Sequence, residues 1–149
     1  MPYYRYKQAV DWFRNQLNMN ENFHTFTQSF IPRGAVAFVE LGENVGNEMS
    51  DKRPVLVVSN DQMNRTSNNV IVAVLTKASN KSVLGVAKIL PTQYEMFKKD
   101  FPFLSYDSIV LFENIVCVSK KRLDKPIGVV PKTEMDKMSD RIKRTFGLY

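Results

Sequence analysis

The middle of the chain consists of short runs of β-branched and other apolar residues separated by turn residues. Such runs predict β-strands, and their close spacing favours an antiparallel sheet or small barrel over alternating strand–helix units. We expect strands at residues 35–41, 54–59, 70–76, 86–90 (weak), 108–112 continuing into 115–118, and 127–130. The long fifth strand is expected to bend at Glu113 and Asn114.

Apolar residues recur at helical spacing near both ends of the chain. The N-terminal stripe predicts an amphipathic helix over residues 4–17, and the C-terminal stripe predicts a helix that packs on the core, with a capping box at Thr133 and Asp136. The two stripes are Ala9, Val10, Phe13 and Leu17, and Met135, Met138, Ile142 and Phe146. The predicted fold is mainly β (α+β): a small SH3-like, partly open antiparallel β-barrel with a C-terminal helix and an extra N-terminal amphipathic helix.

Length and composition are those of one intracellular domain. The 149 residues, 44% of them hydrophobic, suffice for a packed core. There is no run of about 18 apolar residues that would predict a membrane span. The basic N-terminus is not followed by the apolar region of a signal peptide. We therefore expect a cytoplasmic protein with no membrane partner.

Cysteine and histidine are too few for the common metal sites. The chain has one of each, Cys117 and His24, which argues against zinc and against a nuclease that uses two histidines. Acidic residues do not cluster at the ends of neighbouring strands, so we expect no metal and no cofactor. Cys117 lies in an apolar run that predicts a buried thiol. His24 lies in the polar connector, where a surface position is expected rather than a general base.

Basic residues are in excess and clustered, with a net charge of +6 and a pI near 9.5. One group comprises Lys120, Lys121, Arg122 and Lys125, and a second comprises Lys132, Lys137, Arg141, Lys143 and Arg144. Such clusters are typical of proteins that bind polyanions, although simple solubility explains the charge equally well.

Residues 33–76 carry a series of short motifs in a distinctive order. They are Arg33-Gly34 before a strand, Gly46-Asn47-Glu48 in a loop, Arg53-Pro54 opening an apolar strand that stops at Asn60-Asp61, and a strand ending in Thr76. Residues 107–115 then read DSIVLFENI, and Lys120-Lys121-Arg122-Leu123 follows. Over residues 32–149 this order and spacing resembles the MazF/PemK family of toxin ribonucleases. Residues 1–31 would form a helical extension outside that domain.

The resemblance implies a metal-independent endoribonuclease that cuts single-stranded RNA at a short sequence. The RNA 2′-hydroxyl would attack the adjacent phosphorus, leaving a 2′,3′-cyclic phosphate and a 5′-hydroxyl. The catalytic residues implied are Arg53 and Thr76. A guanidinium binds two phosphate oxygens at once, and a hydroxyl can donate a third hydrogen bond. Because arginine cannot act as a base near neutral pH, Arg53 would stabilise charge or donate a proton.

The remaining substrate-binding residues that we expect are Glu48, Lys52, Ser59, Asn60, Lys77 and Asn114. Structural alternatives stay open for several residues: Arg53 could form a rim salt bridge with Glu48 or Asp51, and Thr76 could simply end a strand. The resemblance further implies a homodimer that acts on mRNA as a toxin. A cognate antitoxin would hold it in check through an acidic, disordered tail.

Two departures from the family pattern leave other functions open. Val116, Cys117 and Ser119 replace groove residues that are usual in the family, so base preference cannot be transferred. The insert at 91–106 is long and aromatic, and its rings could stack on bases or pack on the barrel. A non-cleaving module that binds nucleic acid or a protein target is the main alternative, and a metallonuclease is a third.

Overall fold

The structure is a computed structural model that describes residues 3–21, 30–78, 82–83, 86–87 and 89–148. His24 lies outside these residues. The elements are α1 (Tyr3–Glu21), β1 (Ala35–Glu40), β2 (Lys52–Val57), α2 (Asp61–Thr66), β3 (Asn69–Lys77), β4 (Ser82–Val83), β5 (Val86–Ala87), β6 (Gln93–Met96), β7 (Ser108–Ser119), the 3-10 helix η3 (Lys120–Arg122), β8 (Gly128–Val129) and α3 (Lys132–Phe146).

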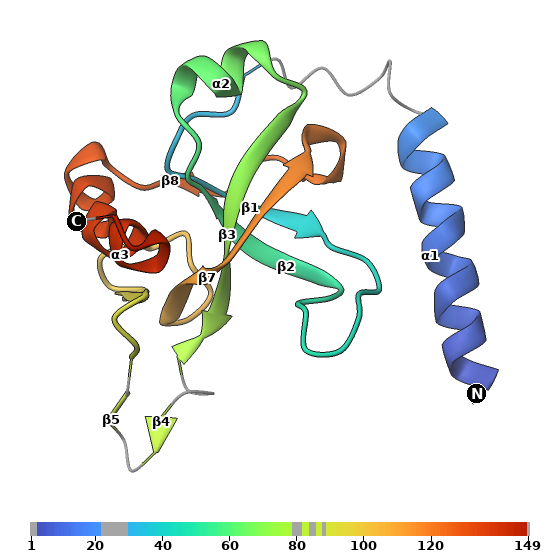
Figure 1. The fold of residues 1–149 in the computed structure, drawn as a ribbon, viewed down its shortest axis with the longest axis horizontal. Coiled ribbons are helices and arrows are strands. Elements are labelled where there is room, and N and C mark those ends of the chain that lie inside the picture. Colours follow the sequence, from blue (N-terminus) through green and yellow to red (C-terminus); the bar gives the residue numbers. More distant parts are fainter. Residues whose placement is uncertain (1–2, 22–29, 79–81, 84–85, 88, 149) are drawn as a thin grey trace.

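Six strands form one antiparallel sheet in the order β6-β7-β3-β2-β1-β8, which curls into a half-barrel (Figure 1). This confirms the predicted fold class. The bend in β7 is also confirmed, because the register with β3 shifts from Ala73↔Ile115 to Val74↔Leu111 and leaves residues 112–114 as a bulge. The weak strand expected at 86–90 is only Val86–Ala87, which pairs with β4 outside the main sheet.

Alternation along the strands divides the apolar residues between two cores. Val55, Val57 and Val74 face the first core, which the curled sheet encloses with Ile31 and Leu123. The alternate residues face a second core, which lies between the sheet and α3. This second core includes Leu56, Leu75, Phe101, Phe112, Met135 and Met138, with Phe103 and Ile142 packed against it. Burial of Phe101 and Phe103 confirms the packing alternative for these two rings of the insert.

Local hydrogen bonds explain the elements that the sequence patterns did not predict. Helix α2 begins because the Asn60 side chain accepts a hydrogen bond from Met63 N at 2.8 Å. Strand β6 lies within the insert and pairs with β7. The prediction of a capping box at Thr133 is wrong, because α3 begins at Lys132 with Pro131 in the cap position and no side-chain cap.

A hydrogen bond between β6 and α3 ties the helix to the edge of the sheet. Tyr94 Oη donates to Glu134 Oε2 at 2.9 Å, and Lys137 Nζ lies 2.6 Å from Glu134 Oε1. Burial, assisted by the hydrogen bond to Glu134, raises the pKa of Tyr94 to about 12. The hydrogen bonds from Lys137 and Tyr94 lower the pKa of Glu134 below its usual value.

We expect Tyr94→Phe to lower the free energy of unfolding by about 1 kcal/mol at neutral pH, because a hydrogen bond to a charged acceptor is lost. The lowered pKa of Glu134 means that its stabilisation is present above the unfolded pKa, about 4.3, and is lost as the pH falls through the folded value. The raised pKa of Tyr94 extends the stabilisation to alkaline pH, where it is lost as the pH rises through about 12.

Urea denaturation at neutral pH and at about pH 3 measures the contribution of this bond. The difference between wild type and Tyr94→Phe should narrow at the acidic pH. The exposed Tyr106, changed to Phe, is the control and should leave stability unaltered. An equal loss in both variants at both pH values would contradict the assignment.

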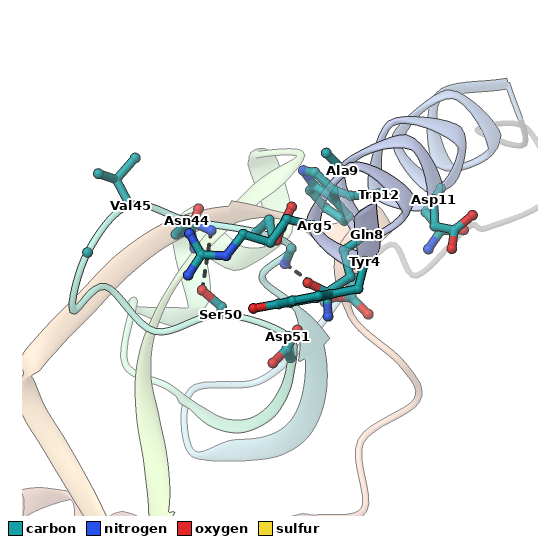
Figure 2. A pocket seen from close by; sticks show the side chains of 15 residues that line it. Tyr4, Arg5, Gln8, Ala9, Asp11, Trp12, Asn44, Val45, Ser50 and Asp51 are labelled. Atoms are coloured by element: carbon teal, nitrogen blue, oxygen red, sulfur yellow. Dashed lines mark hydrogen bonds between the residues drawn. The ribbon is translucent and has the colours of Figure 1, made fainter. Parts of the chain in front are cut away.

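Helix α1 stands beside the half-barrel (Figure 1). Its Trp12 side chain contacts the half-barrel at Gly42. The Trp12 ring covers Gly42, where a Cβ atom would come within 2.2 Å of the ring, and Arg122 lies 5.3 Å from the ring centroid. Gly42 also has φ +76°. Next to this contact, a cleft of about 850 Å³ separates α1 from the loop that joins β1 to β2 (Figure 2). None of the described helices is long and apolar enough to cross a membrane.

We expect Gly42→Ala to displace Trp12 and loosen α1, because the added methyl group would occupy the space of the ring. Trp12 is the only tryptophan of the chain, so its fluorescence reports on this contact alone. The variant should show a red-shifted emission and stronger quenching by acrylamide. Gly46→Ala is the matched control, because Gly46 also has positive φ, +61°, but an added Cβ there would have no atom within 4 Å. Equal spectra for the two variants would argue against this anchor.

Candidate active site

Arg53 and Thr76 lie at the same end of two neighbouring strands. β2 and β3 pair with Val55 opposite Val74, and this register continued by two residues places Arg53 across from Thr76. Since side chains two residues apart share a face, both belong to the face that carries Val55 and Val74. Both are partly exposed. The topology thus brings the two predicted catalytic residues together at the rim of the first core.

The Arg53 side chain is held by the backbone of its own loop. Its Nε donates to the carbonyl oxygen of Ser50 at 3.0 Å. The ion pairs of the described residues involve other side chains, so the alternative of a salt bridge from Arg53 to Glu48 or Asp51 is wrong for this structure. A guanidinium oriented by a neutral carbonyl keeps its full charge for an anionic ligand.

Glu48 and Lys52 also lie at this end of the sheet, and both have partners in the protein. Glu48 is exposed, and its Oε2 accepts a hydrogen bond from Val45 N at 3.3 Å, which closes the loop on itself. Lys52 Nζ lies 2.5 Å from Asp124 Oδ2, with both side chains about half exposed. An exposed pair of this kind contributes little to stability, so a phosphate could replace the carboxylate at low cost.

Ser59 and Asn60 lie beyond the opposite end of β2 from Arg53. Ser59 is 6% exposed, its Oγ is 2.5 Å from Asn64 Oδ1, and it accepts from Ile71 N at 3.0 Å. Asn60 caps α2. Their hydrogen bonds thus stabilise the turn after β2, and the structure does not bring these two residues to the candidate site.

Lys77 and Asn114 flank the site from β3 and β7. Lys77 is exposed at the end of β3, where its Nζ lies 5.0 Å from the centroid of the Tyr106 ring. Alternation directs it to the face opposite that of Thr76. Asn114 is partly buried in the bulge of β7, beside the register shift at Ala73 and Val74. The structure therefore leaves both near the site without a contact to Arg53.

The cleft between α1 and the β1–β2 loop borders the site but has the wrong charge for RNA. Asp11, Glu40, Glu43 and Asp51 line it, with Arg5 as the only cation among its lining residues. Figure 2 shows Arg5 and Tyr4 of α1 reaching toward Asn44, Ser50 and Asp51 of the loop. Because this lining has a net negative charge, it would repel a phosphate backbone. We therefore leave this cleft outside the candidate RNA site.

Lys120, which was counted in a basic cluster, and Cys117, which was expected to be buried, both differ from the sequence-based expectation. Lys120 is buried, its Nζ donates to the carbonyl oxygen of Asn64, and burial lowers the pKa of its ammonium group. It therefore joins η3 to α2 and contributes little to a polyanion surface. Cys117 is exposed, so the prediction of a buried thiol is wrong. The reason is that Val118 faces the first core, so alternation directs Cys117 to the opposite face of β7, where the described residues leave it exposed.

Sequence reasoning missed two partners of the site, Ser50 and Asp124. Ser50 holds Arg53 through a backbone carbonyl, which every residue has, and Asp124 meets Lys52 only through the folding of the chain after η3. Neither leaves a signal in the sequence pattern. Among the described residues, no three His, Cys, Asp or Glu side chains form a group that could hold a metal ion.

Comparison with known proteins places this chain in a family. Residues 32–146 match the family described as PemK-like, MazF-like toxin of type II toxin-antitoxin system. The chain is 36% identical over 118 residues to endoribonuclease EndoA of Bacillus subtilis, covering 79% of this chain and 96% of that protein. It is equally similar to endoribonuclease MazF of Staphylococcus epidermidis, of which 92% is covered.

Solved structures show the same fold. A mycobacterial endoribonuclease in complex with its cognate antitoxin superposes with a TM-score of 0.61 and 26% identity, covering 80% of this chain and 97% of that one. MazF of Deinococcus radiodurans superposes with a TM-score of 0.62 at 16% identity, covering 79% and 97% of the two chains. The matched residues include the strands that carry Arg53 and Thr76. The chain therefore belongs to the PemK-like, MazF-like toxins of type II toxin–antitoxin systems.

Proposed function

We propose that the protein is an endoribonuclease that cleaves single-stranded RNA, including mRNA, without a metal ion. The observation that supports the proposal is the register of β2 with β3, which, continued by two residues beyond Val55 and Val74, would set Arg53 opposite Thr76. The names of the relatives, endoribonucleases EndoA and MazF, support the same activity. The substrate itself supplies the nucleophile, because the 2′-hydroxyl of RNA lies next to the scissile phosphate.

In the proposed reaction the 2′-oxygen attacks phosphorus as its proton passes to water, and the P–O5′ bond breaks. The 5′-oxygen takes up a proton from Arg53 or water and leaves as a hydroxyl, and Arg53 is reprotonated by water. The products are a 2′,3′-cyclic phosphate and a 5′-hydroxyl. Arg53 binds non-bridging phosphate oxygens and stabilises the charge that grows on them, while Thr76 Oγ1 donates a hydrogen bond that orients the phosphate. The carbonyl of Ser50 prevents the guanidinium from swinging away and thereby lowers the reorganisation that the reaction requires.

Four further residues are proposed to bind the RNA, three of them around the scissile phosphate and Lys77, on the opposite face of β3, at a more distant phosphate. They are Glu48, Lys52, Lys77 and Asn114, which lie in the loop, at the start of β2, at the end of β3 and in the bulge of β7. Lys52 would exchange Asp124 for a phosphate oxygen. Ser59 and Asn60 are not carried into the proposal, because their side chains are already used in the turn after β2.

The proposed assembly is a homodimer that acts in the cytoplasm, where its RNA substrate is found, and that is held inactive by a cognate antitoxin. The mycobacterial neighbour was solved with such a partner. We also propose that residues 1–31 form an extension to a domain that comprises residues 32–149, since the family match begins at residue 32.

The test is cleavage of a long, mixed-sequence single-stranded RNA in excess EDTA. Discrete fragments that carry cyclic phosphates and 5′-hydroxyls are expected, because the proposed chemistry needs no metal. If folded protein binds the RNA without cutting it, the alternative of a non-cleaving binding module replaces the proposal. Cleavage that EDTA abolishes would instead favour a metallonuclease.

A further inference from the structure

Helix α1 carries a row of large apolar side chains that the described part of the protein leaves exposed. We call these residues, Tyr3, Tyr6, Val10, Phe13 and Leu17, the α1 stripe. They recur at intervals of three and four residues, and between 44% and 85% of each remains exposed. No residue of α1 is buried. A continuous apolar surface of this kind usually marks an interaction site in a globular protein.

The stripe lies away from the side of α1 that contacts the barrel. At 3.6 residues per turn, its middle is roughly 130° around the helix from Trp12, the residue that rests on Gly42. Docking of α1 therefore uses one side of the helix and presents the other side to partners. The spacing is that of the a and d positions of a heptad repeat, which is how one helix packs along another.

Basic residues border the stripe on both sides. Lys7 and Arg14 lie along its outer flank and are exposed, and Glu21 follows them at the C-terminal end of the helix. On the inner flank, a groove of about 220 Å³ separates the C-terminal half of α1 from η3. Phe13, Leu17 and Met19 line this groove from α1, and Lys121 and Arg122 line it from η3. A partner that covers the stripe would meet positive charge along both edges.

This charge pattern argues against a second copy of α1 as the occupant. In the antiparallel register centred on the stripe, Val10 of one helix would face Phe13 of the other, and Arg14 would then lie beside the second helix's own Lys7. Two repulsive contacts of that kind would form. A parallel pair would set Arg14 against Ala9, which offers no opposite charge. Helices with acidic residues at the flanking positions have no such conflict.

We infer that the α1 stripe and the adjoining groove bind an amphipathic helix of a partner protein. That helix inserts apolar side chains at heptad spacing and places Glu or Asp at the flanking positions, where they meet Lys7 and Arg14 on one side and Lys121 and Arg122 on the other. The site uses none of the residues proposed to bind RNA, and the stripe lies outside the matched range 32–146.

The test is binding of a fluorescent synthetic peptide to the full-length protein. The peptide spans about three heptads, with Leu at positions a and d and Glu at e and g, so that its own charges prevent it from pairing with itself. We expect saturable binding, weakened at least tenfold in the double variant Val10→Gln, Phe13→Gln and weakened by added salt. Gln8→Ala combined with Asn15→Ala, on another side of α1, is the matched control and should bind normally.

Several outcomes would overturn the inference. Equal binding of a peptide with the same residues in scrambled order, or with Lys in place of Glu, would show that heptad spacing or acidic flanks are not recognised. A change from dimer to monomer in the double variant, measured by sedimentation, would assign the stripe to a second copy. Loss of RNA binding in that variant would assign it to nucleic acid. RNA cleavage by the double variant is expected to be normal, so failure of the nuclease proposal would be seen separately.

Discussion

Arg53→Ala is expected to lower the rate of RNA cleavage by about 10³-fold, which corresponds to about 4 kcal/mol of transition-state stabilisation. The guanidinium is the group at this end of the sheet best suited to bind two phosphate oxygens, and the Ser50 carbonyl holds it in place. Without the guanidinium, the negative charge that grows on the phosphate oxygens in the transition state loses its cationic partner. Single-turnover cleavage of a defined RNA substrate, with fragments separated on a gel, measures the effect.

Three companion variants separate charge, geometry and stability. Arg53→Lys keeps the charge but loses the planar fork, so an intermediate rate is expected. Thr76→Val removes only the hydroxyl and should slow cleavage by about 10². Arg33→Ala is the control, because the Nε of Arg33 also donates to a backbone carbonyl, that of Val58, but beyond the other end of β2. Wild-type rates in folded Arg53→Ala would remove this residue from the proposed mechanism.

Gly34→Ala is expected to lower the free energy of unfolding by about 3 kcal/mol or more. Gly34 has φ +93°, and an added Cβ atom would lie 2.6 Å from the carbonyl oxygen of Val130. This close approach is fixed by backbone hydrogen bonds, because Gly34 N donates to Val57 O and Val130 N donates to Gly34 O, each at 2.8 Å. To avoid the added methyl group, the residues around Val130, which lead into α3, would have to move away from Gly34, and the hydrogen bond between these two residues would be lost.

Urea denaturation of Gly34→Ala beside Gly147→Ala distinguishes the clash from the backbone conformation. Gly147 ends α3 at φ +65° and has no atom within 4 Å of an added Cβ, so only the cost of the left-handed conformation, about 1 kcal/mol, is expected there. If the two variants lost the same stability, the contact with Val130 would be of no energetic importance.

Periodicity predicted the parts of the fold in which burial repeats along the chain. The runs at 35–41, 54–59 and 70–76 correspond to β1, β2 and β3, shifted by at most two residues at their ends. They are continuously apolar because alternate residues enter the two cores. α2 and β6 escaped prediction for a different reason. They are short and depend on particular hydrogen bonds, such as the cap from Asn60 and the pairing of Gln93 with Leu111.

The candidate site was predictable only where a motif coincides with a strand end. Arg53 and Thr76 were predicted from the resemblance of their motifs to the MazF/PemK family, and the register of β2 with β3, continued by two residues, sets them opposite each other. Ser59 and Asn60 belong to the same motif, yet their position after β2 directs them into a turn. The apolar positions of the N-terminal helix were evident from the sequence, but their exposure was not. They stay exposed because α1 rests on Gly42 through Trp12, which lies on another side of the helix.

The sheet keeps its longest strands inside and its shortest at the borders. β7 and β3, with twelve and nine residues, are internal, whereas β6 and β8 at the two edges have four and two. An exposed edge offers unpaired backbone groups on which another chain can align and extend the sheet. β6 and β8 offer few of these groups, but β6 pairs only with residues 108–111 of β7, so among the described strands none covers that side of residues 115–119. Strand addition by another chain is therefore expected at residues 115–119 of β7 rather than at β6 or β8, and a charged residue placed there should suppress it.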